Sequence, residues 1–142
     1  MYQTIADGGR RTHLRAVLGI TNAKGHLLRQ YDPSVTRAFE QGPVSLLTHA
    51  LQETMRSGTG RGIYTRFGKS LGLAGKTGTT NDLRDSWFAG FDQERLAVVW
   101  LGRDDNKPIG ITGAGGALVV WGDLMRLLGP RARADQISPD ME

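Results

Sequence analysis

A short stretch near the middle of the chain reads Ala-Gly-Lys-Thr-Gly-Thr-Thr (residues 74–80), which puts a cation and several hydroxyl groups on neighbouring positions. The apolar residues just before it indicate that the stretch lies on an extended strand. On a strand alternate side chains face the same way, so Thr77 and Thr79 would share one face, and Lys76 and Gly78 the other. Such a strand can offer hydroxyl and backbone N–H groups to a carboxylate or to a developing oxyanion.

A strand at the edge of a sheet has unpaired backbone N–H groups, so a peptide-like ligand can add to it as an extra strand. Gly78 has no side chain that would obstruct such a ligand, and Lys76 supplies a fixed positive charge beside it. We therefore take Lys76, Thr77, Gly78 and Thr79 as candidate binding residues. The alternative is a solvated strand in which the triplet occurs by chance.

The same residues invite a comparison with phosphate-binding loops, because Gly75-Lys76-Thr77 has the letters that end a Walker A motif. That motif requires a glycine five positions before its Gly-Lys pair, and this chain has Ser70 there. A second candidate, Gly68-Lys69-Ser70, requires glycine at position 63 and meets Ile63. Both candidates fail, which argues against a nucleotide site.

The composition is that of an ordinary folded domain, with 142 residues, 39% hydrophobic and 23% charged. The net charge is +4, but no run of basic residues occurs, so we expect no nucleic-acid partner. Cysteine is absent, which excludes disulfides and thiolate metal sites. Asp104 and Asp105 are adjacent rather than at ligand spacing, so we expect a solvated loop there and no metal or cofactor. No apolar run approaches the length of a membrane helix, and the first residues do not form a signal peptide.

The first half of the chain contains a predicted helix end, a hairpin and a helix. Residues 1–6 resemble the end of a helix that Gly8 and Gly9 stop. Alternating apolar residues over 14–20, a turn at Asn22–Gly25 and a returning strand over 26–31 predict a half-buried hairpin. After an irregular stretch, residues 43–57 predict an amphipathic helix, whose apolar stripe comprises Val44, Leu47, Leu51 and Met55.

The second half predicts an antiparallel three-strand meander over residues 71–80, 86–92 and 95–102. Phe88 would face opposite to Trp87 and Phe91, and the apolar run of the last strand predicts burial on both faces. A glycine-rich loop precedes the first strand. Residues 114–128 predict a final helix with an apolar stripe, which comprises Leu118, Trp121, Met125 and Leu128. Because the helix also has apolar residues on its other sides, we expect other structure to cover it.

Several blocks in this order resemble the transpeptidase domain of class A, bifunctional penicillin-binding proteins, with the 1B subgroup as the nearest match. They are Met1–Ala6, Gly58–Arg61, Leu73–Asn81, Asp85–Gly90, Gly102–Asn106 and Gly113–Ala117, which together span roughly residues 1–128. The Lys-Thr-Gly triplet is one of the three motifs of serine enzymes that recognise penicillin. The resemblance implies an α+β fold, the C-terminal portion of the serine β-lactamase and penicillin-binding transpeptidase fold. Its antiparallel sheet, a three-strand meander plus a hairpin, would be packed with helices that include a C-terminal helix.

The resemblance also implies an activity, the cross-linking of peptidoglycan by acyl transfer from a D-alanyl-D-alanine stem peptide through a serine. Lys76 and Thr79 would be the catalytic residues, Lys76 by electrostatic stabilisation and Thr79 through its backbone N–H as an oxyanion donor. Thr77 and Thr79 would hold the terminal carboxylate of the donor, and Gly78 would line the strand. Partners would be the stem peptide, β-lactams and the remainder of the transpeptidase domain, on the periplasmic face of the bacterial inner membrane.

The chain departs from the family pattern because neither Ser-x-x-Lys nor Ser-x-Asn occurs in its 142 residues. We therefore expect residues 1–130 to be a partial transpeptidase domain, and residues 131–142 to be a polar, loose tail. The glycosyltransferase domain and the N-terminal membrane anchor would also lie elsewhere. By itself the chain would lack the nucleophile, be inactive and expose apolar faces that favour aggregation. The alternatives are a non-catalytic module that binds peptidoglycan peptides or a partner, and an inactive truncated fragment.

Overall fold

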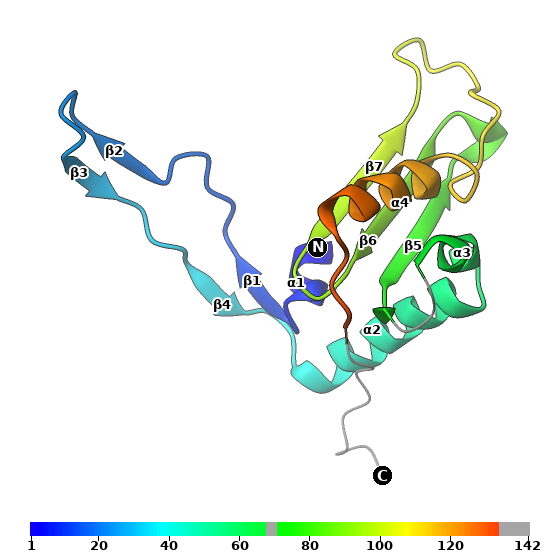
Figure 1. The fold of residues 1–142 in the computed structure, drawn as a ribbon, viewed down its shortest axis with the longest axis horizontal. Coiled ribbons are helices and arrows are strands. Elements are labelled where there is room, and N and C mark those ends of the chain that lie inside the picture. The colour runs from blue at the N-terminus through cyan, green and yellow to red at the C-terminus, as the bar shows by residue number, and fades with distance from the viewer. Residues whose placement is uncertain (68–70, 134–142) are drawn as a thin grey trace.

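The computed structural model describes residues 1–67 and 71–133, which form a small α+β body with a long projecting ribbon (Figure 1). The helices are α1 (Tyr2–Ala6), α2 (Gln41–Arg56), α3 (Tyr64–Phe67) and α4 (Ala117–Leu128), with 3-10 helices η1 (Arg61–Ile63) and η3 (Asn81–Leu83). The strands are β1 (Arg10–Thr12), β2 (Gly19–Thr21), β3 (Leu27–Gln30), β4 (Val35–Arg37), β5 (Ala74–Thr79), β6 (Ser86–Phe91) and β7 (Leu96–Leu101).

The central sheet is the antiparallel meander that the sequence predicts, in the order β5-β6-β7. The register pairs Ala74 with Phe91 at one end of β5 and Thr79 with Ser86 at the other. The two hairpins of this sheet are short, and Asp85 stabilises the first by accepting hydrogen bonds from Thr80 Oγ1 at 2.9 Å and Trp100 Nε1 at 2.8 Å.

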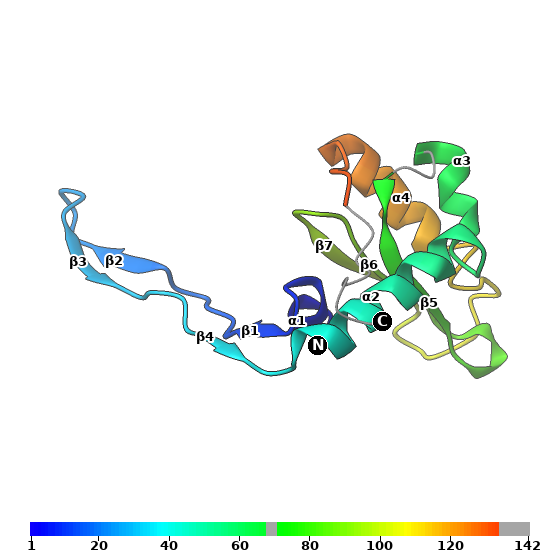
Figure 2. The same cartoon turned by 90° about the horizontal axis from the view of Figure 1, so that it is seen from below.

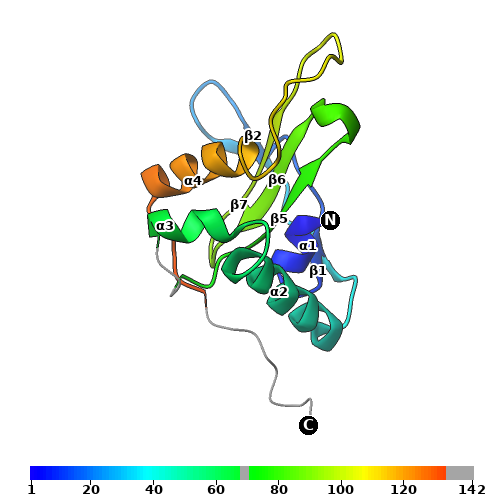
Figure 3. The same ribbon diagram turned by 90° about the vertical axis from the view of Figure 1, so that its right-hand side faces the viewer.

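Two apolar clusters cover the two faces of the sheet. On one face Phe88 packs with α4, and the clustered residues include Met55, Ile63, Leu73, Phe88, Leu118, Trp121 and Met125. On the other face Phe91 and Ala74 pack against α1 and α2 through Ile5, Val44 and Leu51. Figure 3 shows α4 on one side of the sheet and α1 with α2 on the other. Phe88 and Phe91 are thus core residues on opposite faces, as the alternation predicts.

The predicted helical stripes are correct in part. In α2, Val44, Leu51 and Met55 are buried as predicted, but Leu47 is exposed. The buried side of the helix, which faces β5, continues instead through Ser45, Thr48 and Gln52. The last helix begins at Ala117 rather than at residue 114, because residues 113–116 form a turn. Leu128 is exposed, and the side chain of Leu127 is 82% exposed. The outer side of this helix was predicted to be covered by other structure, but no described residue covers it.

Strand β7 is another correction, since burial on both faces was predicted from its unbroken apolar run. Val98 is 53% exposed and Trp100 is 45% exposed, whereas Val99 on the other face packs against the α4 cluster. Trp87 is also exposed and meets Trp100 with ring centroids 6.1 Å apart, so it is not a core residue. No described element covers this part of the sheet.

The predicted hairpin is present, but it is longer and more exposed than expected. Its turn holds together because Asn22 Oδ1 accepts the backbone N–H groups of Lys24 and His26, at 2.9 and 3.0 Å. Strands β2 and β3 flank this turn. Further from the turn β1 pairs with β4, and β4 lies in the stretch after the hairpin that was predicted to be irregular. We call residues 10–37 the arm. It projects from the body with every strand residue but Thr12 exposed, so half-burial was wrong (Figure 2).

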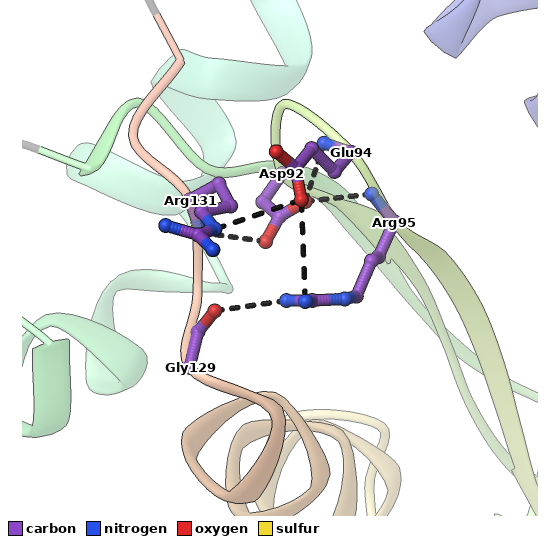
Figure 4. Close-up of polar contacts among 5 residues, drawn as sticks. All are labelled: Asp92, Glu94, Arg95, Gly129 and Arg131. Atoms are coloured by element: carbon purple, nitrogen blue, oxygen red, sulfur yellow. Dashed lines mark hydrogen bonds and ion pairs between the residues drawn. The ribbon is translucent and has the colours of Figure 1, made fainter.

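The segment after α4 crosses the body rather than leaving it. The buried Asp92 carboxylate accepts the backbone N–H groups of Glu94, Arg95 and Arg131, while Arg95 donates to the carbonyl of Gly129 (Figure 4). The backbone N–H of Arg133 then donates to Leu71 O at 2.9 Å. The predicted tail begins at residue 131, and its residues 134–142 lie outside the described part of the chain.

Within the described ranges, none of the helices has the length and hydropathy needed to cross a bilayer.

The crossing segment makes Gly72 sensitive to substitution. Gly72 has φ +57°, and an added Cβ would lie 2.0 Å from Arg133 O, whereas a Cβ at Gly62 would meet nothing within 4 Å. We expect Gly72→Ala to lower the free energy of unfolding by about 1–3 kcal/mol and Gly62→Ala to change it by less than about 0.5 kcal/mol. Urea unfolding followed by fluorescence of the buried Trp121 measures both, and equal effects would contradict this packing.

The loop after β7 allows a pH prediction at Asp105. Arg103 donates two hydrogen bonds of 2.9 Å to its carboxylate, which with Lys107 lowers the Asp105 pKa from 3.8 to about 2. The contact therefore favours the folded loop above pH 3.8 and is lost as the pH falls through 2. An NMR titration should return a pKa near 2, and Arg103→Gln should raise it toward 3.8. A value near 3.8 in the unmodified chain would show that the pair is not formed.

Candidate functional site

Strand β5 presents the predicted residues as the alternation requires. Thr77 pairs with Phe88 and therefore lies on the α4 side of the sheet with Thr79, while Lys76 and Gly78 lie on the side of Ala74. Lys76 and Thr79 are exposed and Thr77 is half-buried. The Lys76 ammonium donates to the carbonyl of Thr77 at 2.9 Å, so it is held close to the backbone of the strand at its solvent side.

The outer edge of β5 is half covered by α2. Thr54 Oγ1 donates to the carbonyl of Gly75, which shows that the peptide groups of Gly75 point away from β6. In an antiparallel strand, alternate residues point their N–H and C=O groups to the same edge. The N–H groups of Thr77 and Thr79 therefore point to the outer edge as well, beyond the end of α2, where a ligand can approach them.

Both hydroxyl groups of the site have a partner that sequence reasoning missed. Thr77 Oγ1 lies 2.7 Å from Thr59 Oγ1, in the glycine-rich loop after α2. Thr79 Oγ1 accepts the backbone N–H of Gly113 at 2.9 Å, from the loop before α4. Both partners lie in blocks that carried the resemblance, but nothing in their residue types indicated these contacts. Each contact fixes the position of one oxygen and leaves that group able to bond a ligand.

A hollow of about 550 Å³ lies next to this strand. Its walls come from the loop after α2 and from the start of α4: Ser57, Gly58, Thr59, Arg61, Gly62, Ala114 and Leu118. Thr59 belongs to both the hollow and the hydroxyl pair with Thr77. None of Lys76 to Thr79 lines this hollow, and Thr77 reaches its wall through the contact with Thr59. Arg61 contributes a cation to the wall of the hollow.

The loop between β7 and α4 closes over the end of the sheet. Ser86, which is buried and pairs with Thr79, donates through Oγ to Thr112 O at 2.9 Å and accepts the N–H of Ala117 at 2.9 Å. The same loop contains Asp104 and Asp105, and Asp105 is engaged with Arg103 and Lys107. In the described ranges no three His, Asp or Glu side chains come together to hold a metal ion.

Comparisons with known proteins agree on one family. Penicillin-binding protein 1B of Vibrio cholerae is 43% identical over 126 residues, which are 89% of this chain and 16% of that protein. Penicillin-binding protein 1B of Haemophilus influenzae is 42% identical over 125 residues, 88% of this chain and 16% of that protein. The chain thus spans about one sixth of the length of these relatives. No protein-family model matches the chain.

Solved structures share the fold. Penicillin-binding protein 1A from Haemophilus influenzae matches with a TM-score of 0.83 at 22% identity, over 94% of this chain and 26% of that one. The D,D-transpeptidase domain of a peptidoglycan glycosyltransferase from Eggerthella lenta matches with a TM-score of 0.66 at 25% identity, over 89% and 30%. The predicted fold class is therefore confirmed. The chain is a homologue of class A penicillin-binding proteins of the 1B type, and it corresponds to a part of their transpeptidase domain.

Proposed function

We propose that the chain supplies the substrate-binding strand of a peptidoglycan D,D-transpeptidase. The observation that carries this proposal is the edge of strand β5, where the N–H groups of Thr77 and Thr79 point outward beside the exposed Lys76. The homology to penicillin-binding proteins supplies the reaction class. The ligand would be a stem peptide ending in D-alanyl-D-alanine, or a β-lactam in its place.

The hydroxyl contacts fit the binding of a terminal carboxylate. A hydroxyl group has one hydrogen to donate and two lone pairs. Thr79 uses a lone pair for Gly113, so its hydrogen is available to a ligand carboxylate. If Thr59 donates to Thr77, the hydrogen of Thr77 is available in the same way. Lys76 adds positive charge beside them, and charge-assisted hydrogen bonds are about twice as strong as neutral ones.

In the acyl-transfer step, a serine oxygen would attack the carbonyl carbon of the penultimate D-alanine, and the terminal D-alanine would leave with a proton. An amine of a second stem peptide would then take the acyl group and release the serine. The N–H of Thr79 would donate to the oxyanion that forms during each attack. Lys76 and Thr79 are the groups that this chain would contribute to catalysis.

The serine and its base would come from the remainder of the transpeptidase domain, since the chain contains neither Ser-x-x-Lys nor Ser-x-Asn. The exposed side of the sheet at Trp87, Val98 and Trp100 gives that remainder an apolar surface to cover. The assembled domain would act on the periplasmic face of the inner membrane. Residues 1–130 would form the partial domain.

A second candidate is a non-catalytic module that binds stem peptides by strand addition, and a third is an inactive fragment. The module is favoured by the outward N–H groups of Thr77 and Thr79, which need no nucleophile to bind a peptide. Covalent labelling by penicillin and reversible binding of a stem peptide distinguish the transpeptidase part, the binding module and the inactive fragment.

We expect the purified chain to take no covalent label from a fluorescent penicillin, because it would lack the nucleophile. When the chain is mixed with a piece of a transpeptidase domain that contains Ser-x-x-Lys and Ser-x-Asn, we expect penicillin to label that piece covalently. Lys76→Ala should reduce this labelling at least tenfold, whereas Lys24→Ala, which removes a lysine at the arm tip, should not. A stable label on the chain itself would refute the missing nucleophile, and reversible stem-peptide binding without restored labelling would favour the module.

The two roles of Thr79 can be separated in the assembled domain. Thr79→Ala keeps the backbone N–H but removes the carboxylate contact and leaves the N–H of Gly113 without its acceptor. We expect acylation by penicillin to slow about tenfold, which is less than the 10²–10³-fold loss of a whole oxyanion donor. Thr79→Ser should retain most of the rate. If Ser and Ala variants are equally slow, the hydroxyl is not what binds the carboxylate.

A further inference from the structure

A second polar hollow, of about 480 Å³, lies where the arm joins the body, at the opposite end of the sheet from Thr79. It is lined by residues from α1, the arm, α2, the β6–β7 turn and the C-terminal segment: Ala6, Asp7, Gly8, Arg10, Arg37, Gln41, Gln93 and Arg133. Three arginines from distant parts of the sequence therefore converge on one space. The proposed transpeptidase function uses none of these residues.

Positive charge in this hollow exceeds the negative charge that faces it. Arg10 forms an ion pair with Asp7 at 2.6 Å, which uses the one carboxylate that lines the hollow. Arg37 Nη1 donates to the carbonyl oxygens of Gly8 and Phe39, at 3.3 and 3.1 Å. Arg10 and Arg37 are also direct cross-strand partners, and like charges in that position repel each other.

Arg133 is the most unusual member of the group. It is only 8% exposed, and its Nε has no hydrogen-bond partner. Its other nitrogens reach the carbonyls of Asp92 and Ala6 at 3.4 and 3.3 Å, and its guanidinium lies over the ring of Phe91. Burial lowers the pKa of Arg133, and the charge of Asp92 offsets this only in part. Asp92 itself is already bonded to three backbone N–H groups.

Burying a guanidinium without a close counter-charge is unfavourable, so a structure that does so favours an anion nearby. The same wall contains Gln41, the first residue of the 16-residue helix α2, whose N-cap residue Glu40 makes no side-chain cap hydrogen bond and whose first turn has no acidic residue. The free N–H groups of that turn attract negative charge. Gln41 and Gln93 can add amide N–H donors.

We propose that this hollow binds a phosphate group. Three arginines face Asp7, with Asp92 offsetting the charge of Arg133 in part, so the hollow keeps a net positive charge, and guanidinium forks bind phosphate oxygens in pairs. The arm adds a longer-range attraction, because residues 10–37 contain six Lys or Arg side chains against Asp32 alone. The site takes either a free phosphate or the phosphate of a lipid headgroup.

This site is independent of the candidate site on β5. Five residue steps separate Ala74, at the hollow's end of the sheet, from Thr79, and at about 3.4 Å each they span about 17 Å. Failure of phosphate binding would therefore leave the transpeptidase proposal untouched, and failure of that proposal would leave this one in place.

The test is a titration of the whole chain with inorganic phosphate at constant ionic strength, followed by amide chemical shifts and by the urea unfolding midpoint. We expect shifts at Gly8, Gln41 and Gln93 and a higher unfolding midpoint. Arg37→Gln and Arg133→Gln should each weaken binding about tenfold or more. Arg11→Gln is the matched control, since it removes the same charge from the adjacent position on the other face of β1 and should leave affinity within about twofold.

A second experiment compares binding of the chain to vesicles of phosphatidylglycerol, which are anionic, with binding to vesicles of phosphatidylcholine. Binding to the anionic vesicles that Arg37→Gln weakens and Arg11→Gln does not would identify a lipid headgroup, and binding of free phosphate alone would identify a soluble ligand. If neither probe binds, or if Arg11→Gln weakens binding as much as Arg37→Gln, the proposal is wrong. Because Arg37 is exposed, this comparison stands even if the buried Arg133→Gln variant fails to fold.

Discussion

The body of this protein depends on one aromatic ring packed over a pair of glycines. Gly75 and Gly90 are cross-strand partners, and a Cβ on either would come within 2.5 Å of the Phe88 ring. The ring can therefore lie close over both glycines and meet Trp121 edge-on with ring centroids 5.1 Å apart, while Trp121 Nε1 donates to Gly90 O at 3.2 Å. This contact holds α4 against β6, and aromatic pairs of this kind contribute about 0.5–1.5 kcal/mol beyond their buried area.

The same packing sets the geometry of the candidate site. Gly75 immediately precedes Lys76, so the residue that receives Phe88 also fixes the start of the functional stretch. At the other end of β5, Ser86 ties the loop before α4 to the sheet, and that loop brings the Gly113 N–H to Thr79. On the outer edge, Thr54 holds the carbonyl of Gly75. Core, loop and helix thus converge on a strand of six residues.

Sequence patterns were reliable where the pattern itself reflects local backbone geometry. The three meander strands, the stop at Gly8 and Gly9, and the helix containing Val44 and Met55 all follow from periodicity and glycine placement. The pairing of β1 with β4 was missed because Val35 is the single apolar residue in Arg10–Thr12 and Val35–Arg37, so no buried face produces an alternation.

Burial was the harder prediction because it depends on what covers an element. The apolar runs at Val98, Trp100 and Leu127 look like core residues, yet no described segment packs on them. In the candidate site, the residue types of β5 could be read from the sequence, whereas the partners Thr54, Thr59 and Gly113 could not. These contacts join positions far apart in the chain, and neither composition nor spacing carries that information.

The central claim is that the outer edge of β5 receives the carboxylate end of a stem peptide. Amide chemical shifts of the chain during titration with a D-alanyl-D-alanine peptide test it most directly. The account predicts that the largest changes fall on Thr77, Thr79 and Gly113, and that a peptide ending in D-alaninamide, without the carboxylate, produces much smaller ones. Equal shifts with both peptides, or shifts confined to residues away from β5, would contradict it.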